Sequence, residues 1–256
     1  MGGLRCFVVV VGAATTLAAQ QMPDRSFRPM LEDRAYATGT GPVVCFDDGH
    51  SNLHTLNEGF WPFADLVRRD GYALRTATVN RESLTDCRLV VIASPRSRVA
   101  DIEDIRRWVG AGGSLLLIVD RDSVAPASEL AVAFGITLTD TAARPGSFRS
   151  TDQTLRPHAI ARGRHAKESA ATVTTFTGLA LRVPADAETV LVSSDGAVHG
   201  AVMRVDMGRA AFFGDPTLFT AQIVGPERRV VGMSARGSEQ NFQFVLNVMH
   251  WLSGVI

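Results

Sequence analysis

A dense group of polar side chains lies in residues 46–55, F-D-D-G-H-S-N-L-H-T. The members that could do chemistry are Asp47, Asp48, His50, Asn52 and His54, which together supply two carboxylates, two imidazoles and an amide. They directly follow the short apolar run of residues 43–46. Because the carboxyl end of a buried parallel strand opens onto the crevice where α/β proteins bind ligands, we expect this loop to be the functional site.

The spacing of the two histidines alone does not define their chemistry. On a helix, His50 and His54 would share one face and could bind a metal ion. Gly49 and the Ser51-Asn52 pair favour a loop instead, and in a loop this spacing is weak evidence. Asp, Asn, Gly and Ser also dominate ordinary turns, so a purely structural loop is the alternative. The presence of two of the chain's six histidines in this loop favours a function.

The composition is that of an ordinary globular protein. The 256 residues are 46% hydrophobic and 20% charged, enough for one large α/β domain or two small ones. Lys plus Arg and Asp plus Glu number 26 each, so no net field attracts nucleic acid or an anionic membrane. We therefore expect no nucleic-acid partner.

The N-terminal residues differ in character from the rest. Arg5 precedes an apolar stretch over residues 6–19, and Leu17-Ala18-Ala19 offers a small-residue cleavage site before Gln20. This pattern predicts a Sec-type signal peptide over residues 1–19 and a secreted or periplasmic protein, attached to a membrane only if the segment stays uncleaved. Residues 20–41 lack periodicity and are interpreted as a leader, so that residues 42–256 form a single domain.

Removal of the signal peptide would leave only two cysteines, Cys45 and Cys87. An oxidising compartment would permit them to pair. Two separate thiols are the alternative, and the sequence favours it slightly. Neither cysteine lies beside a histidine in a catalytic motif, so a cysteine nucleophile has little support.

The first half of the domain alternates short apolar strands with amphipathic helices, which predicts a parallel sheet with crossover helices. Strands are expected at residues 43–46, 72–78, 88–94 and 115–119, and helices at 62–69, 102–109 and about 126–134. Arg96 follows the third strand and Asp120 follows the fourth. Both should therefore lie at the sheet edge that carries the polar loop.

The second half has a more β-like pattern. Residues 135–171 lack strong periodicity, and strands are expected at 172–176, 188–193, 198–205 and 209–213. Apolar residues at helical spacing predict a closing helix over 241–252 that covers the sheet. His250 on this helix is interpreted as a packing residue, and the isolated His158, His165 and His199 as surface or structural residues.

With these elements placed, the chain resembles the class I glutamine amidotransferase-like, flavodoxin-like fold, in a branch of secreted bacterial domains of unknown function. The resemblance covers about residues 42–254. It is carried by F-D-D-G-H-S-N-L-H-T (46–55), P-F-A-D-L-V-R-R-D-G-Y (62–72), W-V-G-A-G-G-S-L-L-L-I-V-D (108–120), T-F-T-G (175–178), L-F-T-A-Q (218–222) and N-V-M-H-W-L-S-G (247–254). It implies an α/β parallel sheet with flanking helices and a β-rich C-terminal half. It also implies that the third strand lies beside the first, which would bring the two cysteines close together.

The chain departs from the amidotransferases at their catalytic positions. Those enzymes carry a Cys nucleophile after the strand that matches residues 115–119, where this chain has Asp120-Arg121-Asp122. Ser123 lacks the flanking glycines of a nucleophile elbow and is interpreted as a helix cap. Gly214-Asp215-Pro216 stands where those enzymes have their catalytic His. Glutamine hydrolysis by that route is therefore excluded.

Two functions remain open. The first is a non-catalytic domain that binds a small polar ligand, a glycan or a protein partner through Asp47, Asn52, Asp120 and Arg96. The second is a hydrolase in which His50 or His54 carries a proton and Asp47 or Asp48 orients it or binds a divalent cation. Asn52 would donate to an oxyanion or a sugar hydroxyl, and Asp120 would close the site. The absent nucleophile favours binding, whereas the density of the cluster favours an enzyme.

Overall fold

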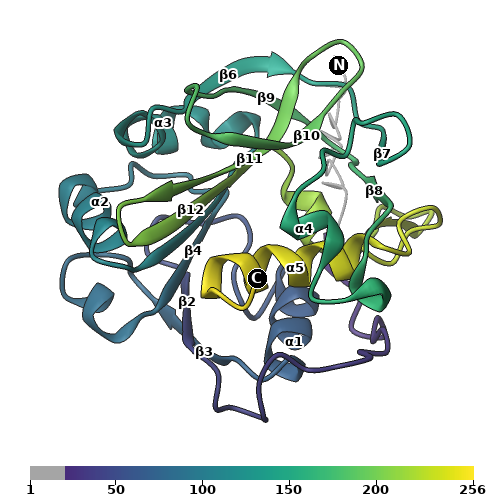
Figure 1. Ribbon diagram of the computed structural model, residues 1–256, viewed down its shortest axis with the longest axis horizontal. Coiled ribbons are helices and arrows are strands. Elements are labelled where there is room, and N and C mark those ends of the chain that lie inside the picture. Colours follow the sequence, from purple (N-terminus) through teal and green to yellow (C-terminus); the bar gives the residue numbers. More distant parts are fainter. Residues whose placement is uncertain (1–20) are drawn as a thin grey trace, which may run out of the picture.

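The structure is a computed structural model, and it describes residues 21–256. The predicted signal peptide lies outside the described residues. Figure 1 shows a twisted central sheet with helices on both faces. None of the described helices is long and apolar enough to cross a membrane.

The central sheet is mixed. It has nine strands in the order β3-β2-β4-β5-β12-β11-β9-β6, and β10 pairs with β11 away from this path. The parallel part comprises β3 (Ala73–Ala77), β2 (Val43–Asp47), β4 (Leu89–Ala93), β5 (Ser114–Ile118) and β12 (Gly208–Phe213). The antiparallel part comprises β11 (Val198–Val205), β9 (Leu179–Arg182), β6 (Thr137–Ala142) and β10 (Glu188–Val192).

The parallel sheet expected for the first half of the domain is confirmed, and β12 from the second half adds a fifth parallel strand. The parallel strands follow the flavodoxin-type order, in which the chain first adds β3 on one side of β2 and then adds β4 and β5 on the other side. All residues of β4 and β5 are buried, as expected for continuous apolar strands covered on both faces. The β-rich half extends this sheet through antiparallel strands and does not form a separate layer.

Helices cover the two faces of the sheet in pairs (Figure 1). Helices α1 (Trp61–Arg69) and α5 (Asn241–Ser253) pack on one face, and α2 (Ile102–Gly110) and α3 (Val124–Ala133) pack on the other. Alternate residues of a strand enter opposite cores, so Leu116 packs with α1 and α5 while Leu115 packs with α2 and α3. These helices match the predicted ones to within about two residues, the usual uncertainty of helix ends.

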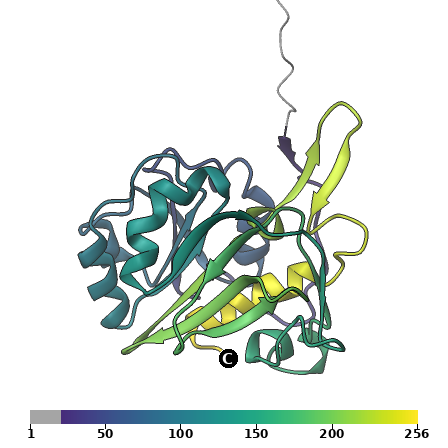
Figure 2. The ribbon, with the colours of Figure 1, turned by 90° about the horizontal axis from the view of Figure 1, so that it is seen from above.

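A small second sheet stands beside the main one. Strand β1 (Gln21–Pro23) pairs with β13 (Ala221–Val224), which forms a hairpin with β14 (Arg229–Gly232). Figure 2 shows this hairpin extending from the body of the molecule. The remaining short elements are β7 (Ser147–Arg149), β8 (Thr172–Thr174) and α4 (Ala159–Arg162). The sequence did not predict the hairpin, β6, β7, β9 or α4.

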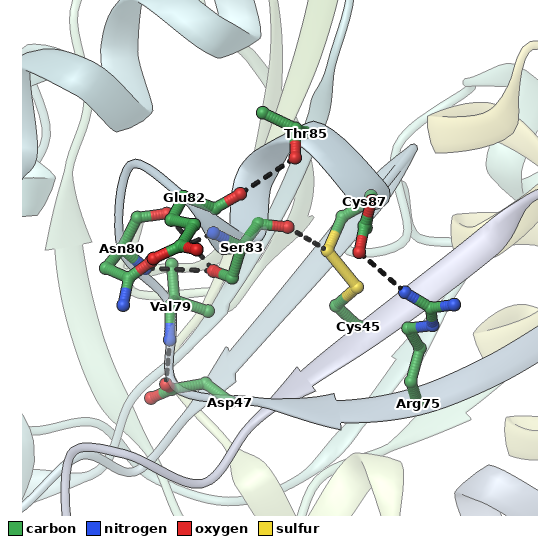
Figure 3. Close-up of a disulfide and its surroundings, with 10 residues drawn as sticks. Cys45, Asp47, Arg75, Val79, Asn80, Glu82, Ser83, Thr85 and Cys87 are labelled. Atoms are coloured by element: carbon green, nitrogen blue, oxygen red, sulfur yellow. Dashed lines mark hydrogen bonds and ion pairs between the residues drawn. A yellow bond between two sulfur atoms is a disulfide. The ribbon is translucent and has the colours of Figure 1, made fainter.

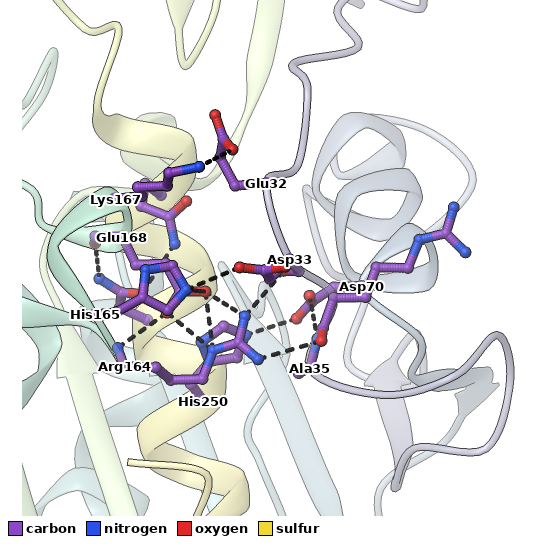
Figure 4. A network of polar contacts seen from close by, with 12 residues as sticks. Glu32, Asp33, Ala35, Asp70, Arg164, His165, Lys167, Glu168 and His250 are labelled. Carbon is purple, nitrogen blue, oxygen red and sulfur yellow. Dashed lines mark hydrogen bonds and ion pairs between the residues drawn. The ribbon is translucent and has the colours of Figure 1, made fainter.

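The segment before β2 lies against the domain. A buried pair joins Asp70 at the end of α1 to His250 on α5, with 2.7 Å between Oδ2 and Nε2. The other oxygen of Asp70 accepts a hydrogen bond from the Ala35 amide at 2.8 Å. Arg164 binds Glu168 and also donates to the backbone of the same segment (Figure 4). His250 is therefore a hydrogen-bond partner of Asp70 as well as a packing residue.

Cys45 and Cys87 form a disulfide (Figure 3). Their Cα atoms lie 5.8 Å apart, because β2 pairs with β4 and Cys87 comes just before β4. The expected neighbourhood of the two cysteines is confirmed, and the expectation of two separate thiols is wrong. The sequence could not decide this because the strand order, not the spacing of the two residues, sets the distance.

Candidate functional site

Hydrogen bonds within the loop of residues 46–55 hold most of its polar side chains. His50 Nδ1 donates to Asp47 Oδ2 at 2.8 Å. Figure 3 shows the second bond of this carboxylate, in which Asp47 Oδ1 accepts from the Val79 amide at 3.0 Å. Asn52 accepts from the His50 amide at 3.1 Å and donates to the Ala93 carbonyl at 3.0 Å. The hydrogen bond to Asp47 raises the pKa of His50 above its ordinary value. These bonds fasten the loop to β3 and β4.

A cavity of about 310 Å³ opens beside this loop. Its walls come from the ends of β4, β5 and β12, from residues 176–178 and from the β13–β14 hairpin. The polar and charged residues of the lining include His54, Arg96, Asp120, Arg121, Gln222 and Arg229.

The cavity unites three of the predicted site residues. His54, Arg96 and Asp120 line it, although they follow three different strands. Asp47, His50 and Asn52 are buried in the loop and do not line it, and Asp48 is exposed. The expected convergence of the whole loop on one crevice therefore holds only for its last part.

Arg96 and Asp120 form a two-pronged ion pair. The guanidinium donates to the two carboxylate oxygens at 2.8 and 3.0 Å. Burial alone would raise the pKa of Asp120, but the hydrogen bonds from Arg96 and the charge of Arg96 lower it below its ordinary value. Ser123 donates its amide to Asp120 at 3.0 Å and accepts the Asp120 amide at 2.7 Å. In this reciprocal cap Asp120 is the N-cap residue and Ser123 is its partner at N3, whereas the Ser123 side chain makes no cap hydrogen bond to α3, so the prediction of Ser123 as the helix cap is only partly correct.

His54 is held in the cavity wall as a neutral imidazole. Its ring stacks on Phe60 with 5.0 Å between centroids and an interplanar angle of 1°. Burial lowers its pKa to about 4, the charge of Asp120 opposes this change, and Arg96 reinforces it. Nδ1 is enclosed and has no hydrogen-bond partner within the described residues. Nε2 is therefore the ring nitrogen left to meet a ligand.

Gly59 explains how the ring fits. A Cβ at this position would lie 2.4 Å from His54 Nδ1, so any larger residue would displace the imidazole. The sequence analysis did not single out Gly59, because the close approach exists only after the loop has folded back onto the start of α1.

Asp215 orders another wall of the cavity. It is fully buried, and its carboxylate accepts hydrogen bonds from the Phe176 amide at 2.8 Å, the Thr177 hydroxyl at 2.6 Å and the Thr217 amide at 2.8 Å. Burial raises its pKa, and these hydrogen bonds oppose the rise. Asp215 thus stabilises two cavity loops from behind.

Sequence reasoning missed the hairpin residues of the cavity. Gln222 and Arg229 belong to short strands without a clear alternating pattern. Gln222 on β13 pairs with Pro23 on β1, and Arg229 on β14 pairs with Val224 on β13. Within residues 21–256, no group of three or more His, Cys, Asp or Glu side chains is arranged to hold a metal ion.

Comparisons with known proteins identify the fold and nothing narrower. No family model matches this chain, and no curated protein matches it. Similar solved structures include the mmIFT52 N-terminal domain, with a TM-score of 0.65, 17% identity, and coverage of 82% of this chain and 97% of that one. A glutamine amidotransferase from Thermotoga maritima has a TM-score of 0.51 and 12% identity, and the match covers 83% of this chain and 98% of that one.

A third similar structure belongs to a larger enzyme. The exo-beta-1,4-mannosidase Op5Man5 from an Opitutaceae bacterium has a TM-score of 0.51 and 16% identity, with coverage of 83% of this chain and 36% of that one. At these identities the likeness concerns the fold alone. The glutamine amidotransferase-like architecture implied by the sequence is therefore supported.

Proposed function

We propose that this protein is an exported, non-amidotransferase member of the glutamine amidotransferase-like fold that binds a small polar ligand in the cavity lined by His54, Arg96 and Asp120. The observation that carries the proposal is the state of Asp120. It occupies the position of the missing nucleophile, and both its oxygens are bound by Arg96. A carboxylate engaged in this way recognises and positions a ligand better than it attacks one.

The cavity suits binding in two further respects. Its volume of about 310 Å³ is at the small end of the range of about 300 to 1,000 Å³ that is typical of ligand sites. Its wall combines apolar groups such as Val231 with a few polar groups that can fix the orientation of a ligand. A neutral His54 with a pKa of about 4 is a weak general base at neutral pH, but it can exchange hydrogen bonds with a hydroxyl group.

A hydrolase is the second candidate, and the Asp47–His50 pair favours it. A carboxylate that orients an imidazole at 2.8 Å is an arrangement that general bases use. The pair does not line the cavity, however, and Asp47 also holds the Val79 amide. These contacts support a structural role, in which the pair fixes the loop that carries His54.

Export is part of the proposal. A Cys45–Cys87 disulfide is consistent with an oxidising compartment, because such bonds are rare in reducing ones. A glycan or protein segment with a polar end group is an alternative occupant of the same cavity. The balanced charge argues against nucleic acid.

Ligand-observed NMR on the mature protein tests this function. We would screen D-glucose, D-galactose, D-mannose, D-glucuronate and L-glutamine, and follow the His54 ring signals in parallel. At least one compound should bind saturably with a Kd of about 1 mM or tighter, and it should shift the His54 signals.

Two matched variants locate the binding. Arg96→Gln removes a cavity guanidinium and should abolish binding, whereas Arg98→Gln removes an exposed one that pairs with Glu129 and should not. Absence of binding by every compound, equal effects of the two variants, or release of ammonia from L-glutamine would contradict the proposal.

A further inference from the structure

Two guanidinium groups of the cavity have no partner. Arg121 follows β5 and Arg229 begins β14, so they belong to the sheet edge and to the hairpin, respectively. Both are exposed, and neither side chain makes an ion pair or a hydrogen bond with residues 21–256. Arg96, the third guanidinium, is already bound to Asp120.

The charges around the cavity leave a positive excess. The positively charged lining residues are Arg96, Arg121 and Arg229, and the negatively charged ones are Asp120 and Asp122. Asp122 lies 3.8 Å from Arg96 and is largely exposed, so water screens its charge. With His54 neutral, the lining carries one net positive charge, which a single negative charge on a ligand would balance.

The rest of the lining offers hydrogen bonds to neutral groups. Thr177 donates its hydroxyl to Asp215, which leaves its oxygen as an acceptor for a ligand. Gln222 and His54 are buried but line the cavity, and within residues 21–256 the Gln222 side-chain amide and His54 Nε2 make no hydrogen bond. Such mixed donors and acceptors match hydroxyl groups, which act as both.

We infer that the ligand is a small hydroxylated carboxylate, of the size and charge of a hexuronate, whose carboxylate meets Arg121 and Arg229 and whose hydroxyls meet His54 and Gln222. This inference rests on the proposed binding function and names its ligand class. Guanidinium groups bind carboxylates through paired hydrogen bonds. A phosphate monoester would bring about two negative charges and exceed the balance of the cavity.

The size of the cavity suits a single sugar unit. Its volume of about 310 Å³ accommodates a monosaccharide acid, and a longer ligand would extend into the adjoining depression that shares His54 and Gln222 with it. The hairpin would then cover the carboxylate end of the ligand, because Arg229 comes from it.

Isothermal titration calorimetry with D-glucuronate, D-glucose and D-glucose 6-phosphate tests the inference. D-glucuronate should bind the wild-type protein at least about tenfold more tightly than D-glucose, since a charge-assisted hydrogen bond contributes about that much affinity. D-glucose 6-phosphate should bind more weakly than D-glucuronate. The double variant Arg121→Gln/Arg229→Gln should remove the preference for D-glucuronate while it retains the binding of D-glucose.

The double variant Arg98→Gln/Arg236→Gln is the matched control. It also removes two exposed guanidinium groups, but neither residue lines this cavity, so it changes the net charge equally and should leave the preference intact. Equal binding of D-glucuronate and D-glucose, an unchanged preference in Arg121→Gln/Arg229→Gln, or loss of the preference in the control variant would each overturn the inference. Equal binding of both sugars would leave the proposed binding function standing, whereas the failure of all compounds in the wider screen would refute that function itself.

Discussion

The neutral state of buried His54 predicts a loss of stability in mild acid. Burial lowers the pKa of His54 to about 4 in the folded protein, from an ordinary value of 6.5. Above pH 6.5 the imidazole is neutral in both the folded and the unfolded chain, so its contribution to stability is fully present. As the pH falls from 6.5 to 4, His54 becomes protonated in the unfolded chain but stays neutral in the folded protein, so the free energy of unfolding decreases.

The magnitude follows from the two pKa values. A difference of about 2.5 is worth about 3 kcal/mol, because each pKa unit corresponds to about 1.36 kcal/mol. His50 acts in the opposite direction, since its raised pKa stabilises the protein below pH 6.5 and this contribution is lost as the pH rises through the folded value. His158 and His199 have lowered pKa values and act in the same direction as His54.

A comparison of two proteins therefore isolates the effect. His54→Phe keeps an aromatic ring against Phe60 but cannot titrate. Urea unfolding at pH 7, 6, 5 and 4 should show that the wild-type protein loses about 3 kcal/mol more than the variant across this range. A ring-proton NMR titration gives the pKa of His54 directly. Parallel stability curves for the two proteins, or a measured pKa near 6.5, would refute the reasoning.

Three further outcomes are expected. Replacement of Cys45 and Cys87 by Ala should lower the free energy of unfolding by about 4 kcal/mol, because the disulfide closes a loop with a sequence separation of 42; a change below about 1 kcal/mol in urea unfolding would contradict this. Gly59→Ala should displace the His54 ring and weaken ligand binding at least about tenfold with little loss of helix content by circular dichroism, and unchanged His54 NMR signals would argue against the packing described above. Asp120→Asn should lower the pKa of His54 below about 4, because it removes a nearby negative charge; an unchanged or higher pKa in an NMR titration would show that the charge of Asp120 does not act on His54.

The sequence by itself predicted the four parallel strands of the first half, β2 to β5, and showed that no Cys follows the strand of residues 115–119. A short continuous apolar run such as Leu115 to Ile118 is typical of a strand that is buried on both faces. The local sequence pattern was therefore enough to predict β4 and β5. The absence of a Cys after β5 was also visible in the sequence, because the identity of a residue does not depend on the fold. The short strands β6, β9, β13 and β14 were not predictable, because their pairing depends on partners far away in the chain.

The tertiary structure decided which polar residues form a site. The loop of residues 46–55 looked like one functional unit, yet Asp47 and His50 turn inward to bind each other and the Val79 amide. His54 instead meets Arg96 and Asp120, which come from other strands. Sequence states which groups are present, but the direction of a side chain in a loop follows from hydrogen bonds to distant backbone atoms. Strand order likewise determined the pairing of the cysteines, because it alone brings β2 beside β4.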